Sequence, residues 1–200
     1  SDCHDKFFKD IRNLFFPDDN MSSQCMAKGL YYELYLNDIH CGYAVALNGA
    51  DAIKKYSHIF NDVDRILFDE FQSENNKYCT DEIKKLLSVH TSVARGRGKQ
   101  IRYVPVYMCG NTVSLLNPYY TALGISDRLK KDTQFLRGDG FVLEQGFIES
   151  ASNAMMESGF NRAFSSSDYV AYASQNIYLN DNFAFLERPE GRGRYMYTIK

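Results

Sequence analysis

Two adjacent carboxylates, Asp69 and Glu70, are the residues of this chain best placed to do chemistry. They follow Ile66–Phe68, a short apolar run without proline or glycine that suits a strand buried on both faces of a parallel sheet. Carboxylates at the point where such a strand emerges are costly unless they meet a metal, a water molecule or a cation. One acid could hold the shell of a magnesium ion while the other orients or deprotonates an attacking water. The alternative is an ordinary buried strand that runs into a polar loop.

In nucleoside triphosphatases this pair of acids is the Walker B arrangement, with Asp69 at the metal and Glu70 at the water. The phosphate loop that accompanies it has the pattern GxxxxGK[ST], which occurs nowhere in the 200 residues. A Walker B interpretation therefore predicts a nucleotide site that lacks its main phosphate cradle within this chain.

The stretch Arg95-Gly-Arg-Gly-Lys99 allows three interpretations. Its glycines and cations could end a helix and form a solvated loop. Arg95 or Arg97 could instead be an arginine finger, an always-charged fork that reaches phosphates bound by a neighbouring subunit. A contact with the phosphate backbone of DNA is the third possibility.

A second candidate position follows the apolar run Arg102–Cys109, which predicts a neighbouring strand with Pro105 at an edge or a bulge. Asn111 and Thr112 come directly after it. Enzymes of this kind place a γ-phosphate sensor at the tip of the strand beside Walker B. Because an asparagine side chain both donates and accepts hydrogen bonds, Asn111 could hold the attacking water or a phosphate oxygen.

Local patterns predict the elements that position these residues. Two strand-like runs around Asn37-Asp38 indicate a β-hairpin or two neighbouring strands, and Asn117-Pro118 has the form of a helix start. His90, on the apolar face of an expected helix, is interpreted as a satisfied residue at the edge of the core. Phe141–Glu144 is expected to join the same sheet as the Walker B strand. Helical segments are expected over residues 4–15, 48–56, 80–94, 148–156 and 161–173.

Composition limits the function classes. The chain is 44% hydrophobic and 24% charged with a net charge of −2, which is ordinary for a globular protein and gives no overall basic field for nucleic acid. No apolar stretch is long enough to span a bilayer, so no membrane partner is expected. Five cysteines without CxxC spacing favour reduced thiols in a cytoplasm-like compartment.

The order of several blocks resembles that of the DNA-encapsidation ATPases of small tailed phages, packaging motors related to the terminase large subunit. The most specific blocks are Ile66-Leu-Phe-Asp-Glu-Phe71 and Asn111-Thr-Val-Ser-Leu-Leu-Asn-Pro-Tyr-Tyr120. Supporting blocks are Phe7-Phe-Lys-Asp-Ile11, Ala46-Leu-Asn-Gly-Ala50 and Asp168-Tyr-Val-Ala-Tyr172.

This resemblance implies an α/β fold, the P-loop NTPase core of the additional-strand, conserved-glutamate class, with a mostly parallel sheet flanked by helices. It implies ATP and Mg²⁺ as cofactors, with Asp69 at the metal, Glu70 at the water, and Asn111 and Thr112 in the sensing motif. Arg95 or Arg97 would act in trans, with Arg95 the first choice. The implied partners are double-stranded DNA, a prohead with its portal, and further copies of the chain in a ring. The implied place is the cytoplasm of an infected bacterium, transiently at the prohead vertex.

The departures from the family pattern predict an incomplete core. Residues 1–145 would form a partial ATPase core, 146–190 a lid or linker, and 191–200 the start of a C-terminal nuclease-like domain. Without a phosphate loop, the chain alone is expected to bind ATP poorly and not to hydrolyse it. Without the phosphate-loop strand, the strand ending at Cys109 is expected to leave an open edge through which the chain pairs with another copy or aggregates. Two rivals remain open: another P-loop nucleic-acid motor such as a helicase-like ATPase, and a non-catalytic DNA-binding piece whose acids merely cap a strand.

Overall fold

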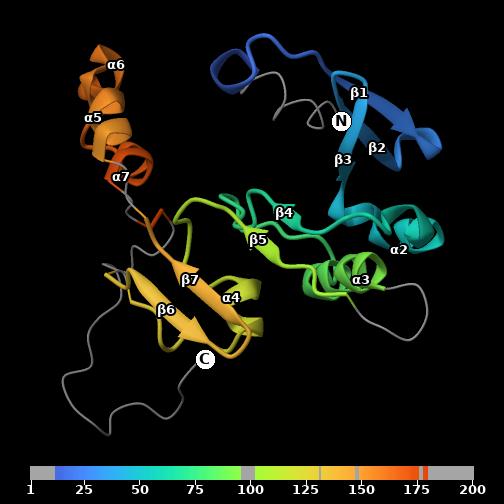
Figure 1. Cartoon of the computed structure of the whole chain (residues 1–200). Helices are drawn as coiled ribbons and strands as arrows, with labels where there is room; N and C mark the ends of the chain where they lie inside the picture. The colour runs from blue at the N-terminus through green and yellow to red at the C-terminus, as the bar shows by residue number, and fades with distance from the viewer. Residues whose placement is uncertain (1–11, 96–101, 131, 147–148, 176–177, 180–200) are drawn as a thin grey trace, which may run out of the picture. The chain divides into compact units, whose positions relative to one another are not determined.

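The fold is known from a computed structural model that describes residues 12–95, 102–130, 132–146, 149–175 and 178–179. The chain divides into two units (Figure 1). The first unit comprises residues 1–71 and 77–109, and the second comprises residues 72–76 and 110–200. Residues 12–15 are helical, as expected for the end of the 4–15 segment, but most of that segment, together with Arg97 and residues 191–200, lies outside the described residues.

The first unit contains a three-stranded antiparallel sheet of β1 (Met21–Met26), β2 (Tyr31–Leu36) and β3 (Ile39–Val45), in that order. The hairpin between β2 and β3 confirms the sequence prediction. Its two turn residues, Asn37 and Asp38, have φ of 50° and 63°, as a tight type I′ turn requires. β1 was not predicted, because its sequence MSSQCM shows no clear alternation of apolar and polar residues.

One short helical segment, η2 (Ala27–Gly29), connects β1 to β2. Three more lead from β3 to β4: η3 (Leu47–Gly49), α2 (Ala50–Ile53) and η4 (Lys54–Phe60). A longer helix, α3 (Glu82–Ala94), follows β4 in the chain. Buried residues of α2, η4 and α3 form one core with β2 and with the chain before β5. The buried members of that core are Tyr31, Ala50, Ile53, Phe60, Val89, Val93, Ala94 and Val104.

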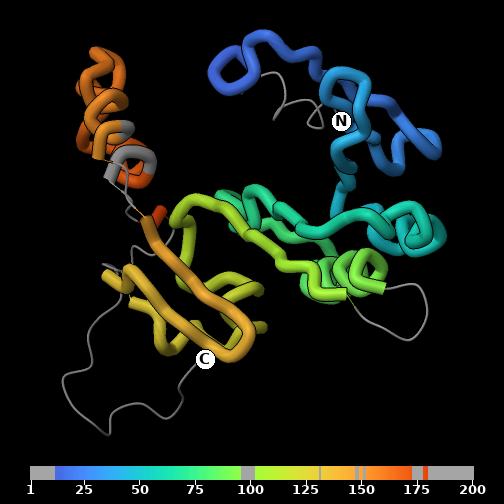
Figure 2. Tube along the Cα trace, in the orientation of Figure 1, coloured from blue at the N-terminus to red at the C-terminus, as the bar shows by residue number. Residues whose placement is uncertain are grey.

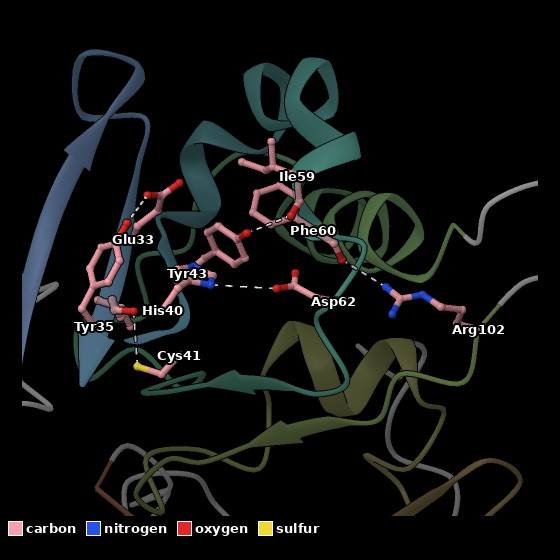
Figure 3. Close-up of polar contacts among 10 residues, drawn as sticks. Glu33, Tyr35, His40, Cys41, Tyr43, Ile59, Phe60, Asp62 and Arg102 are labelled. Atoms are coloured by element: carbon pink, nitrogen blue, oxygen red, sulfur yellow. Dashed lines mark hydrogen bonds and ion pairs between the residues drawn. The ribbon is translucent and has the colours of Figure 1, made fainter. Parts of the chain in front are cut away.

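Aromatic rings join the sheet to this core. The Tyr31 ring lies 6.2 Å from that of Phe60, and the Tyr43 ring lies 4.9 Å from it, both edge to face. The Tyr43 hydroxyl donates a hydrogen bond of 2.8 Å to the backbone oxygen of Ile59, as Figure 3 shows. Burial, followed by the negative charges of Asp62 and Glu33, raises the pKa of Tyr43 to about 12.

β4 (Ile66–Phe68) and β5 (Val106–Met108) pair in parallel, which confirms that the two predicted strands are neighbours (Figure 2). Two expectations for this sheet are wrong. Leu67 and its register partner Tyr107 are 54% and 56% exposed, so the strands are not buried on both faces. The sheets are also not mostly parallel: among the described residues β4 and β5 are the one parallel pair, because the other strands are joined by short hairpin connections.

The second unit combines a hairpin with short helices: α4 (Pro118–Ala122), β6 (Phe135–Gly138), β7 (Phe141–Glu144), α5 (Glu149–Glu157), α6 (Gly159–Ala163) and α7 (Asp168–Gln175). The expectation that Phe141–Glu144 joins the Walker B strand is wrong, because β7 pairs antiparallel with β6 in a sheet of its own. The Gly138 backbone lies so close to the Phe141 ring that a Cβ there would collide with it. The predicted start of α4 is confirmed, since the Asn117 side chain accepts a hydrogen bond from the Tyr120 amide at 2.9 Å.

Candidate functional site

Asp69 and Glu70 stand where the β4–β5 ladder changes register. The Cys109 amide donates to the Phe68 oxygen at 2.9 Å, and the Phe71 amide donates to the Cys109 oxygen at 3.2 Å. In a regular parallel ladder, one residue forms its two backbone hydrogen bonds with two residues of the partner strand that are two positions apart. Here Cys109 bonds to Phe68 and Phe71, which are three positions apart. The chain that continues β4 therefore carries one extra residue relative to β5, a bulge that contains both acids.

The bulge puts Glu70 in the left-handed region, with φ of 53°. A side chain in that region costs on the order of 1 kcal/mol relative to glycine, and such residues gather at functional sites. Asp69 and Glu70 are both exposed. The chain thus holds an exposed pair of carboxylates at a strained turn, at the edge where β4 and β5 both end.

The acids fit magnesium carried by a nucleotide better than a metal held by protein alone. Within the described ranges, no three His, Cys, Asp or Glu side chains gather in a way that could hold a metal ion. Mg²⁺ in nucleotide sites needs only one or two carboxylates, because waters and phosphate oxygens complete its shell. An exposed aspartate at a strand end supplies such a ligand, and the acid beside it can reach a water.

Asn111 and Thr112 belong to the second unit, whereas Asp69 and Glu70 belong to the first. Asn111 is exposed, and its backbone oxygen accepts a hydrogen bond of 3.0 Å from the Val113 amide. The Thr112 oxygen accepts one of 3.3 Å from the Leu179 amide. The structure thus gathers the ends of β4 and β5 within the first unit, and builds the Asn111–Thr112 turn as part of the second.

Gln72 holds this turn and was not found from the sequence. Its side chain is 6% exposed. Its Oε1 accepts from the amides of Val113 at 3.3 Å and Ser114 at 3.0 Å, and its Nε2 donates to the Tyr120 hydroxyl at 3.0 Å. The one signal in the sequence is that Gln72 directly follows the Asp-Glu-Phe block, where a polar residue reads as part of a loop.

Tyr172 in α7 was also missed, although its block had been noted as family pattern. It is 5% exposed, and its hydroxyl donates a hydrogen bond of 3.1 Å to Glu74 Oε1. Burial, with the Glu74 carboxylate acting in the same direction and the Asn111 side chain against it, raises the pKa of Tyr172 to about 12.

Of the two candidate arginines, Arg95 lies among the described residues and Arg97 does not. Arg95 is exposed and ends α3, with its amide donating to the Thr91 oxygen at 3.1 Å. It lines an open pocket of about 340 Å³ together with Lys54 and several hydroxyl side chains. Arg97 lies outside the described residues.

Arg102 and His90 bind backbone oxygens and so stabilise the fold. Arg102 Nη2 donates to the backbone oxygen of Phe60 at 3.1 Å, as Figure 3 shows. It also donates to the backbone oxygen of Val93 at 2.7 Å, so this cation stabilises the carboxyl end of α3. His90 Nε2 lies 2.9 Å from the Val104 oxygen, which agrees with its interpretation as a satisfied residue at the core edge. The described cysteines, Cys25, Cys41, Cys79 and Cys109, are free thiols, as expected.

Comparison with known proteins gives one family and several structures. The family model described as Podovirus DNA encapsidation protein (Gp16) matches residues 4–200. The crystal structure of the N-terminal domain of the DNA packaging ATPase from bacteriophage phi29 is 26% identical with a TM-score of 0.52, over 72% of this chain and 67% of that one. No curated protein matches the chain.

Two motor structures share the fold at lower identity. The bacteriophage Phi-29 viral genome packaging motor assembly is 22% identical with a TM-score of 0.55, and covers 96% of this chain and 55% of its own. The Phi-28 gp11 DNA packaging motor is 16% identical with a TM-score of 0.51, over 84% of this chain and 50% of that one. The chain therefore spans about half the length of these motor chains. Among the residues that the structure describes, every helix is too short or too polar to cross a lipid bilayer.

Proposed function

The chain belongs to the podovirus DNA encapsidation protein (Gp16) family, and from this premise we propose that it is the part of a packaging motor ATPase that carries the water-activating acids. In the intact protein, hydrolysis of ATP would drive double-stranded DNA into a prohead. The similarity to the N-terminal domain of the phi29 packaging ATPase, at 26% identity, supports an α/β ATPase-like domain.

The observation that carries this proposal is the bulge at the end of β4. It presents Asp69 and Glu70 to solvent beside the end of a parallel neighbour strand, with Glu70 in a strained backbone conformation. Asp69 would hold the magnesium ion of the nucleotide, and Glu70 would orient or deprotonate the attacking water. The nucleotide with its metal supplies the phosphoryl group and the charge that these acids meet.

The remaining roles follow the same proposal. Asn111 would sense the γ-phosphate, since its carboxamide can bond to a phosphate oxygen or to the attacking water, and Thr112 would line the nucleotide site. Arg95 or Arg97 of one subunit would neutralise charge at the site of the next. Such a role requires a ring of copies around the DNA, at the portal of the prohead and in the cytoplasm of the infected bacterium.

The test is Glu70→Gln in the intact protein, with ATP hydrolysis and nucleotide binding measured separately. Loss of a general base lowers the rate by roughly 10²- to 10⁴-fold. Because the amide keeps the size of the side chain, binding of ATP should remain within about threefold of wild type. Glu144→Gln, at an exposed acid that ends β7, is the matched control and should hydrolyse normally. Normal hydrolysis by the Glu70 variant would refute the catalytic assignment.

A further inference from the structure

The buried side chain of Gln72 is bonded at both ends of its carboxamide. Oε1 accepts from the Ser114 amide at 3.0 Å and from the Val113 amide at 3.3 Å. Because two N–H donors require an acceptor, these contacts place the oxygen, and they direct Nε2 to the Tyr120 hydroxyl at 3.0 Å. The carboxamide is therefore held in one orientation by partners that all belong to the second unit.

The bonds at Oε1 bear directly on the turn that carries Asn111. The Val113 amide that reaches Gln72 also donates to the Asn111 backbone oxygen at 3.0 Å, the bond that closes this turn. At the other end of the carboxamide, Tyr120 lies in α4. One buried side chain thus connects the closing bond of the Asn111 turn to the helix that follows it.

Gln72 is also the second residue after Glu70. The residue between them, Phe71, donates its amide to the Cys109 oxygen at 3.2 Å within the first unit. The chain that leaves the acids is therefore fixed by a backbone bond at Phe71 and, one residue later, by the side chain of Gln72. The two most specific blocks of the sequence, which end at Phe71 and begin at Asn111, are joined through a residue that belongs to neither.

We propose that Gln72 is a positioning residue for ATP hydrolysis, whose Oε1 sets the backbone at Asn111 through the Val113 and Ser114 amides. The inference rests on the proposed role of Asn111 as the γ-phosphate sensor. It adds that the placement of this sensor depends on an acceptor in the loop after the acids. Displacing a catalytic group by about 1 Å can lower a rate on the order of 100-fold, and loosening one of several anchors should cost less.

The test measures steady-state ATP hydrolysis and thermal unfolding of variants of the intact protein. Gln72→Met keeps the length of the side chain and removes both hydrogen-bonding ends. Gln72→Glu keeps an acceptor for the two amides, and the Tyr120 hydroxyl can rotate to donate to its second oxygen. Asn161→Ala is the matched control in the second unit, because it removes a side-chain bond of 2.8 Å to the Met155 oxygen and has no proposed role in hydrolysis.

We expect Gln72→Met to lower kcat about five- to tenfold and to leave KM for ATP within about twofold, because a contact strengthened in the transition state acts on kcat. Gln72→Glu should recover most of the lost kcat, and Asn161→Ala should keep the wild-type value. The decisive readout is non-additivity: once Asn111 is alanine, Gln72→Met should lower kcat no further. Tyr120→Phe loosens the same carboxamide with a smaller change in packing, so the same cycle can be run with it if Gln72→Met does not fold.

Three results overturn the inference while the proposed function stands. The first is wild-type kcat in Gln72→Met while Asn111→Ala is impaired. The second is an equal loss in Gln72→Met and Gln72→Glu, which would show that the acceptor does not matter. The third is a double variant whose kcat falls by the product of the single effects. A fully active Asn111→Ala variant would instead remove the sensor role itself, and this inference with it, so that variant alone distinguishes the two failures.

Discussion

Gln72→Ala should loosen the turn that carries Asn111. The substitution removes the hydrogen bonds to the Ser114 amide and to the Tyr120 hydroxyl, both at 3.0 Å. The Val113 amide is less affected, because it also donates to the Asn111 oxygen at 3.0 Å. These two hydrogen bonds, one buried and one partly buried, at about 1 kcal/mol each give a loss of about 2 kcal/mol for this region. That loss corresponds to roughly a 30-fold rise in the population of the open turn.

Hydrogen–deuterium exchange followed by mass spectrometry can measure this loss at its site. Peptides that contain residues 112–120 should exchange roughly 30-fold faster in Gln72→Ala, if exchange reports the equilibrium of local opening. Gln134→Ala is the matched control, because Gln134 is exposed and contributes only its backbone oxygen, which accepts from the Gln145 amide. Equal exchange in the two variants would refute the view that Gln72 holds the Asn111–Thr112 turn.

Two further predictions concern the first unit. Asn37→Ala should lower the free energy of unfolding by about 1–3 kcal/mol, because Asn37 sits at φ of 50° and its Oδ1 accepts from the Asn20 amide at 2.8 Å. The measurement is urea titration of both variants. Asp38→Gly, at φ of 63°, should be neutral or stabilising, and an equal loss in both variants would contradict the turn argument. Raising the pH from 10 to 12 should destabilise the wild type more than Tyr43→Phe. The folded state raises the pKa of Tyr43 from 10.0 to about 12, so its contribution is complete below pH 10 and is lost as pH rises through 12. Parallel curves for the two proteins would show that this hydroxyl does not titrate differently on unfolding.

The parts of the fold that follow from adjacent residues were predictable. Asn37-Asp38 tolerates the left-handed conformation of a tight hairpin turn, and Asn117 before Pro118 both caps a helix and presets its first residue. The helix over 80–94 follows from its apolar spacing, and it is found as α3. In each case the residues that determine the turn or helix lie within that turn or helix.

The parts that failed depend on partners far away in sequence. Phe141–Glu144 has the pattern of a strand, but nothing within it selects β6 as its partner over the Walker B strand. The apolar run at 66–68 has the composition of a doubly buried strand, yet the exposure of Leu67 depends on what covers that face. Gln72 and Tyr172 find their partners 41 to 98 residues away, so their roles become visible only in the folded chain.

The strained turn at Glu70 is consistent with the proposed catalytic role of this acid. A loop that only has to leave the sheet would be more stable with glycine at φ of 53°, because glycine has no Cβ to strain. The extra residue of the bulge also interrupts the ladder with Cys109, which costs regular pairing. Both costs fall on the one exposed pair of acids at the shared end of β4 and β5. The proposed function places the water-activating carboxylate at this position, and such strain is common at functional sites.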